Sequence, residues 1–212
     1  MGSSYSIQVD YNYLCNRDHP TSPWTYWKAV WKAEAIPKVK FFMWTLLKGK
    51  TLTSENLQKK GIMGPSQCPN CLEVEETMQH LFVSCPFAIS CWKGIASFHT
   101  FTWNSHHSIG EALSNWKKSY PWKNKKNNIS KRVWDALPYV ILWKIWITRN
   151  CKVFRDQETL TRQLCSKAKS LAIETIATKS LKKIDMASLC SEEKDFIRNL
   201  IDKCNILPLE IT

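Results

Sequence analysis

The sequence predicts a mainly α-helical protein: a small helical domain built round a zinc knuckle, followed by a helical C-terminal region. Apolar residues recur at helical spacing along most of the chain, and no convincing run of alternating residues indicates a strand. Proline and glycine stand at the ends of the apolar segments, where helices begin and end. Of the 212 residues 44% are hydrophobic and 23% charged, so the chain has enough apolar side chains to build a core.

The first two predicted helices are rich in aromatic residues. Ser22 followed by proline is typical of a helix start, and the indoles that follow lie on one helical face: Trp24, Trp27 and Trp31. Pro37 begins a second helix that Gly49 ends. Apolar residues surround most of this second helix, so we expect it at the centre of the core.

The remaining helices are predicted from the same signals. Short or moderate helices are expected over residues 54–60, 109–118, 159–182 and 191–203, the first capped by Ser54 and stopped by Gly61. Thr77 is expected to cap a helix that carries His80, and Pro86 to separate it from the next helix. The longest helix should run from residue 130 to about 154, kinked or split at Pro138.

A change in composition divides the chain. Residues 117–129 are basic and rich in asparagine, which is typical of a linker. We therefore predict a zinc-binding domain over residues 1–116, a basic linker over 117–129 and a helical region of unknown role over 130–212. Within the first domain we expect one hydrophobic cluster, made by Trp27, Trp31, Phe42, Trp44, Leu57, Phe82 and Trp92.

Four potential metal ligands lie close together in the sequence. Two residues separate Cys68 from Cys71, eight separate Cys71 from His80, and four separate His80 from Cys85. Three thiolates and one imidazole at such spacing are typical of a closed, tetrahedral zinc site, which leaves no position for a catalytic water. The sequence therefore predicts one bound Zn²⁺ in a structural role.

The cysteines allow three other interpretations. Cys91 is an alternative ligand because it lies near Cys85, although its spacing is less suitable. A redox role for the Cys68–Cys71 pair would require a preceding strand, and none is predicted. Four unrelated core residues are the third possibility. The dispersed cysteines are expected to act as small apolar residues. His106 and His107 could bind a metal, but a solvated loop is the preferred interpretation of this pair.

The charge of the chain favours a polyanionic partner. The net charge is +12, and residues 68–92 contain three glutamates but no lysine or arginine, so the basic excess flanks the cysteine cluster. RNA or DNA is the expected partner, and Trp116 or Trp122 could stack on unpaired bases if exposed. Any one lysine could instead belong to a solvated face. The candidate contact residues are Lys38, Lys40, Lys48, Lys50, Lys123, Lys125 and Lys126.

These motifs together resemble the zinc-binding domain of plant non-LTR retrotransposon reverse transcriptases. Residues 5–92 carry most of the resemblance, and residues 134–154 resemble the segment that precedes the RNase H domain in those polyproteins. The resemblance rests on Trp27, Trp31, Ile36 to Phe42, Trp44, Leu52, Thr53, Asn56, Leu57, Gly61, Ile62, Cys68, Pro69, Cys71, Glu76, Thr77, His80 to Phe82, Cys85, Pro86, Trp92, Trp143, Trp146, Arg149, Asn150 and Phe154. It implies an accessory module that helps a polymerase to hold nucleic acid.

The sequence also departs from that family's polyproteins. No polymerase motif of the Tyr-x-Asp-Asp type and no carboxylate set of an RNase H is present, so we predict no enzyme. The alternative function is a zinc-stapled structural or protein-interaction module, docking through apolar helices and derived from a non-functional or repurposed transposon fragment. No secretory signal or membrane-length apolar run is evident, and clustered thiols favour a reducing compartment, nuclear or cytoplasmic.

Overall fold

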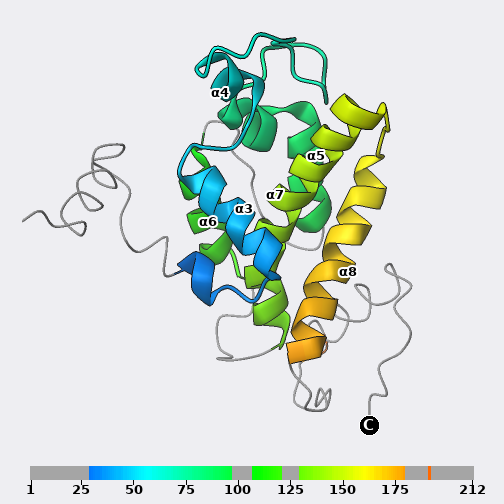
Figure 1. Ribbon diagram of the computed structural model, residues 1–212. Helices are drawn as coiled ribbons and strands as arrows, with labels where there is room; N and C mark the ends of the chain where they lie inside the picture. The colour runs from blue at the N-terminus through cyan, green and yellow to red at the C-terminus, as the bar shows by residue number, and fades with distance from the viewer. Residues whose placement is uncertain (1–28, 97–106, 121–128, 180–190, 192–212) are drawn as a thin grey trace, which may run out of the picture. The chain divides into compact units, whose positions relative to one another are not determined.

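The computed structural model describes residues 29–96, 107–120, 129–179 and 191. The chain divides into two compact units, Met1–Lys32 and Ala33–Thr212, and the elements below all belong to the second (Figure 1). They follow the order α3 (Pro37–Leu47), α4 (Ser54–Gln58), the π-helical turn η1 (His80–Ser84), α5 (Pro86–Ala96), α6 (Ile109–Lys118), α7 (Ile129–Arg155) and α8 (Thr161–Lys179). Among the described residues there is no strand beyond one isolated bridge, so the predicted helical fold is confirmed.

Helix α3 has the bounds that the sequence predicts. It starts at Pro37, and Gly49 follows its end with a φ of 69°, in the left-handed region that glycine adopts without strain. The Gly49 amide donates to the Leu46 carbonyl at 3.0 Å, and the Lys50 amide to the Thr45 carbonyl at 2.9 Å, so the last carbonyls of the helix are satisfied.

The prediction that α3 lies at the centre of the core is wrong. One face is buried, through Val39, Phe42, Met43 and Leu46. The opposite face keeps Phe41 60% and Trp44 37% exposed. The helix is apolar on both sides, but the described elements pack against one side of it.

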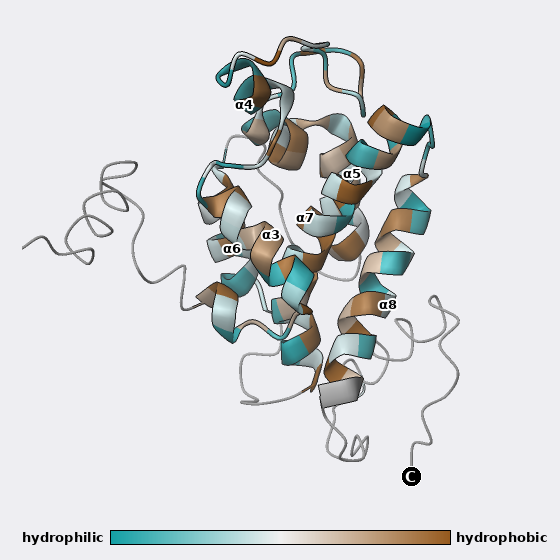
Figure 2. Ribbon diagram, viewed as in Figure 1, coloured by the Kyte–Doolittle hydropathy of each residue, from teal (hydrophilic) through white to brown (hydrophobic). Residues whose placement is uncertain are grey.

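Helix α7 is the central element of this unit. It packs against α3, α5, α6 and α8, and its longest contact is with α8 (Figure 1). Buried apolar side chains recur along it at Val133, Leu137, Ile141 and Ile145. Helix α8 has an apolar stripe of its own, and Figure 2 shows brown segments between polar ones along it. The buried residues of the stripe are Leu164, Cys165, Ala168, Ala172, Ile173 and Ile176.

Pro138 lies inside α7 without splitting it, contrary to one of the two outcomes expected. Proline lacks an amide hydrogen, so the carbonyl of Trp134, four residues earlier, loses its helical partner. The indole Nε1 of Trp116 on α6 donates to that carbonyl at 2.8 Å, and the Trp134 indole donates to the Trp116 carbonyl at 3.0 Å. The two rings are stacked, with centroids 4.3 Å apart. The α6 contact thus satisfies the polar group that proline leaves unpaired.

The predicted hydrophobic cluster is correct in part. Phe42 and Phe82 are buried with ring centroids 5.9 Å apart, and Trp92 is buried as well. Trp44 is 37% exposed, so its assignment to the core is wrong, and Trp31 belongs to the first of the two units. Trp146 on α7 lies against both phenylalanines instead, at 6.2 and 6.4 Å. Trp27 lies outside the described residues.

Some boundaries also differ from prediction. Thr53, not Ser54, precedes α4, and the Ser54 hydroxyl donates to the Pro65 carbonyl at 2.6 Å. Residues 121–128 and most of the predicted helix 191–203 lie outside the described part, and the three-domain division remains a prediction. No described helix combines the length and apolar character needed to cross a membrane.

Candidate metal centre

A short hairpin carries the first two cysteines. The Cys68 amide donates to the Val74 carbonyl at 2.8 Å, and the Glu76 amide to the Ser66 carbonyl at 2.7 Å, which joins the two arms. The Leu72 amide donates back to the Cys68 carbonyl at 2.9 Å. Leu72 takes a φ of 59°, which turns the chain directly after Cys71. The hairpin therefore holds both sulfurs at one end of a tight turn.

The second pair of residues comes from the helical segment that follows. The Thr77 hydroxyl accepts a hydrogen bond from the His80 amide at 3.0 Å, so the predicted cap is confirmed. The Cys85 amide donates to the His80 carbonyl at 2.7 Å, closing the π-helical turn η1. Pro86 then begins α5. His80 and Cys85 thus lie at the two ends of one wide turn.

The four side chains converge. The ligand atoms of Cys68, Cys71, His80 and Cys85 all lie within 4.8 Å of one another, and Cys71 Sγ is 3.2 Å from His80 Nε2. Tetrahedral zinc with ordinary bond lengths needs ligand atoms about 3.5–3.8 Å apart, so small side-chain adjustments suffice. Cys68 and Cys85 are buried, whereas Cys71 and His80 are part-buried. The donor set and its spacing fit a metal ion and are consistent with Zn²⁺.

The thiols of this cluster perturb one another. The pKa of Cys68 is lowered to about 5, chiefly by a hydrogen bond with Cys85 and also by the amides of Cys71 and Asn70, against the opposing effect of burial. The same contact with Cys68, together with burial, raises the pKa of the Cys85 thiol. A bound cation would favour the thiolate form of both sulfurs.

The comparison with protein families agrees with this geometry. The family described as zinc-binding in reverse transcriptase matches residues 5–92, a range that contains all four clustered residues. The match supports a zinc-binding domain of this kind over that part of the chain. No curated protein and no solved structure matches the chain.

An ion pair that the sequence did not predict anchors the hairpin to α7. Arg149 Nε and Nη2 donate to the two carboxylate oxygens of Glu76 at 2.6 and 2.7 Å. The side chains of Arg149 and Glu76 are 7% and 1% exposed. The Ser54 amide donates to the same carboxylate at 2.9 Å. Both charged residues belong to the motifs that carry the family resemblance. The sequence signal that could have indicated this pair is an arginine beside the apolar stretch of α7, because a buried charge needs a partner.

The predicted lysine contacts lie on α3 and the turn after it. Lys38 and Lys50 are exposed, and Lys40 and Lys48 are part-exposed. The other three candidates, Lys123, Lys125 and Lys126, lie outside the described residues, as does Trp122. Trp116 is 1% exposed, so the idea that it stacks on bases is wrong.

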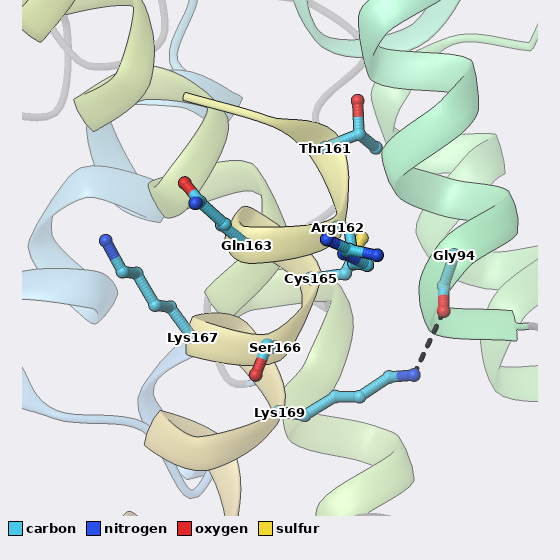
Figure 3. A pocket seen from close by; sticks show the side chains of 8 residues that line it. All are labelled: Gly94, Thr161, Arg162, Gln163, Cys165, Ser166, Lys167 and Lys169. Carbon is cyan, nitrogen blue, oxygen red and sulfur yellow. Dashed lines mark hydrogen bonds between the residues drawn. The ribbon is translucent and has the colours of Figure 1, made fainter. Parts of the chain in front are cut away.

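Two further cysteines, on α5 and α8, form a separate pair. Cys91 on α5 and Cys165 on α8 are buried, and the Cys165 thiol donates to the Cys91 carbonyl at 3.5 Å. Cys91 is not part of the metal cluster. Cys165 also borders a cavity of about 740 Å³ along α8, where Lys169 Nζ donates to the Gly94 carbonyl at 3.0 Å (Figure 3). Burial agrees with the packing role expected for these two cysteines.

Proposed function

We propose that this chain is a non-catalytic, zinc-binding accessory module of a retrotransposon-derived reverse transcriptase, of the plant non-LTR type, that binds RNA or DNA through lysine-rich surfaces. The observation that carries the proposal is the convergence of three cysteines and one histidine inside a segment that matches a reverse-transcriptase zinc-binding family. A reducing compartment, nuclear or cytoplasmic, would keep these thiols available to the metal.

Zinc would be held by Cys68, Cys71, His80 and Cys85. When bound, it supplies a cross-link between the hairpin and the turn that begins α5, and a complete set of four protein ligands leaves no coordination position for substrate. The acidic hairpin around it is a poor surface for phosphate, because it exposes Glu73 and Glu75. The metal therefore serves the fold, and other surfaces must meet nucleic acid.

Metal content tests the zinc assignment. Mass spectrometry of the metal content should find one zinc per chain in the purified protein, and the Cys71→Ser variant should lose this zinc. Cys151→Ser is the matched control, because Cys151 is also part-buried but lies on α7 outside the cluster. Protein that folds without zinc, or stoichiometric zinc in Cys71→Ser, would contradict the assignment.

Charge and placement support the nucleic-acid assignment. No acidic residue occurs between Glu34 and Glu55, a stretch that includes α3 and carries four lysines: Lys38, Lys40, Lys48 and Lys50. Phosphate contacts by such lysines release counterions, so affinity should fall steeply with salt and depend little on sequence. On single strands each contact contributes a slope of about −0.7 in a plot of log affinity against log salt.

Fluorescence anisotropy with labelled strands across a salt series tests this assignment. Lys38→Glu combined with Lys50→Glu should weaken binding to every sequence and flatten the salt dependence. Lys93→Glu combined with Lys167→Glu changes the net charge equally at exposed positions of α5 and α8, and should have the smaller effect. Equal losses of affinity in the two double variants would show that only the overall charge matters. No binding at low salt by zinc-loaded protein would reject nucleic acid as the partner.

A protein-interaction module is the second candidate, and one observation favours it. Apolar side chains near the metal hairpin are strongly exposed: Ile62 by 53%, Met63 by 87%, Leu72 by 57% and Val74 by 49%. Exposed apolar groups of this kind are typical of contact surfaces. Substitution of Met63 and Leu72 by serine should leave nucleic-acid binding unchanged if the lysine surface is the functional one.

A further inference from the structure

The solvent face of α3 is aromatic where a polar face is expected. Successive residues of an α-helix are rotated by about 100°, so Phe41, Trp44 and Lys48 lie in one row along the helix. The buried residues of α3 lie on the opposite side. Phe41 is 60% and Trp44 37% exposed, although amphipathic helices normally place charged or polar residues there.

The two rings form a preassembled pair. Their centroids are 5.7 Å apart and their planes differ by 26°, a stacked arrangement. The buried face of α3 already supplies core contacts through Phe42, whose ring lies against Phe82 and Trp146. The exposed parts of the two rings therefore present apolar surface to solvent.

Positive charge surrounds the pair on the same helix. Lys38 and Lys40 lie to either side of the row, and Lys48 continues it one turn beyond Trp44. At 1.5 Å per residue, Lys48 lies about 6 Å along the axis from Trp44. A protein surface would be matched by the apolar area alone, whereas the combination of flat rings with flanking cations matches unpaired bases joined by phosphates.

We propose that Phe41 and Trp44 form a stacking platform for the bases of single-stranded RNA or DNA, with the phosphates held by the flanking lysines. The inference rests on the proposed nucleic-acid function and adds to it a preference for unpaired over paired strands. Base pairs in a duplex are stacked on one another and keep their faces from the rings. Every base has a π-face, so the platform would show little sequence preference.

The test compares four labelled probes of equal length: oligo(U), oligo(dT), an abasic strand and a duplex. Wild-type protein should bind the two base-bearing strands more tightly than the abasic strand. Phe41→Leu combined with Trp44→Leu retains apolar volume but removes the π-faces, and should lose about 5- to 150-fold for each base that stacks. Its affinity for the abasic strand and the duplex, and its salt slope, should remain those of the wild type.

Phe154→Leu is the matched control, because Phe154 is 76% exposed on α7, away from the row. Equal affinity of wild type and the double variant for oligo(U) would overturn the platform while the salt slope still supported the lysine surface. An equal loss on the duplex, or no preference of wild-type protein for bases over abasic sugar, would also overturn it. Absence of all binding at low salt would reject the underlying nucleic-acid function. A protein partner that binds the wild type but not the double variant would assign the rings to protein contact.

Discussion

Removal of one partner from the buried Glu76–Arg149 pair should be among the most destabilising changes outside the metal cluster. In Arg149→Met the Glu76 carboxylate, 1% exposed, loses two charge-assisted hydrogen bonds of 2.6 and 2.7 Å. Of these three donors only the Ser54 amide, at 2.9 Å, then remains. A buried charge left without its partner costs about 3–5 kcal/mol in free energy of unfolding.

Replacing both partners separates this penalty from loss of packing. Glu76→Met combined with Arg149→Met removes both charges, so it should cost less than Arg149→Met alone. Lys59→Met is the control for an exposed pair, since Lys59 Nζ lies 2.5 Å from Glu55 at exposures of 64% and 36%, and should cost below about 1 kcal/mol.

Urea unfolding at saturating zinc, followed by tryptophan fluorescence, measures all of these variants. A loss below about 1 kcal/mol in Arg149→Met would refute the assignment of a buried, essential pair. A double variant as unstable as the single one would refute the reasoning about uncompensated charge. In that event packing by the long Arg149 side chain, which lies over the Trp146 ring at 5.3 Å, would be the dominant contribution.

Three further changes test the packing of the helices, each by urea unfolding. Trp116→Phe removes the donor to the carbonyl that Pro138 leaves unpaired, so its cost should fall by about 1–2 kcal/mol when Pro138→Ala restores a helical amide. Gly94→Ala places a Cβ 2.7 Å from Cys165 Sγ, so it should be better tolerated, by about 1–3 kcal/mol, in a Cys165→Ala background. Trp44→Ala, at a 37% exposed position, should cost less than about 2 kcal/mol; a loss of 3–5 kcal/mol would return Trp44 to the core.

Local signals predicted the elements well because their causes are local. Pro37 fixes the start of α3 through its own dihedral angle, and Gly49 ends it through a φ that other residues adopt at a cost. The metal cluster was equally accessible, since Cys68, Cys71, His80 and Cys85 lie within one short segment whose spacing sets their geometry. Thr77 capping the turn at His80 belongs to the same class of prediction.

Features that depend on distant partners were not accessible in this way. The apolar residues of α3 would allow either of two faces of the helix to be buried. Which face is buried depends on where α7 places Trp146, whose ring lies against Phe42. Glu76 and Arg149 are 73 positions apart, and their pairing requires the register of α7 against the hairpin, which no local pattern specifies. Pro138 indicates a break until the Trp116 indole, 22 positions earlier, is known to satisfy the freed carbonyl.

The hairpin connects metal binding with the packing of the helices. Cys68, Cys71 and Glu76 lie on the same short loop, so a metal that fixes the two sulfurs also positions the carboxylate that Arg149 binds. By the same linkage, the ion pair already restricts the hairpin before metal binds, so the hairpin loses less conformational entropy on binding. α7 then carries this order to α3, with which it packs directly. A metal site in an acidic hairpin can therefore help to order the basic, aromatic face of α3 through the packing of α7.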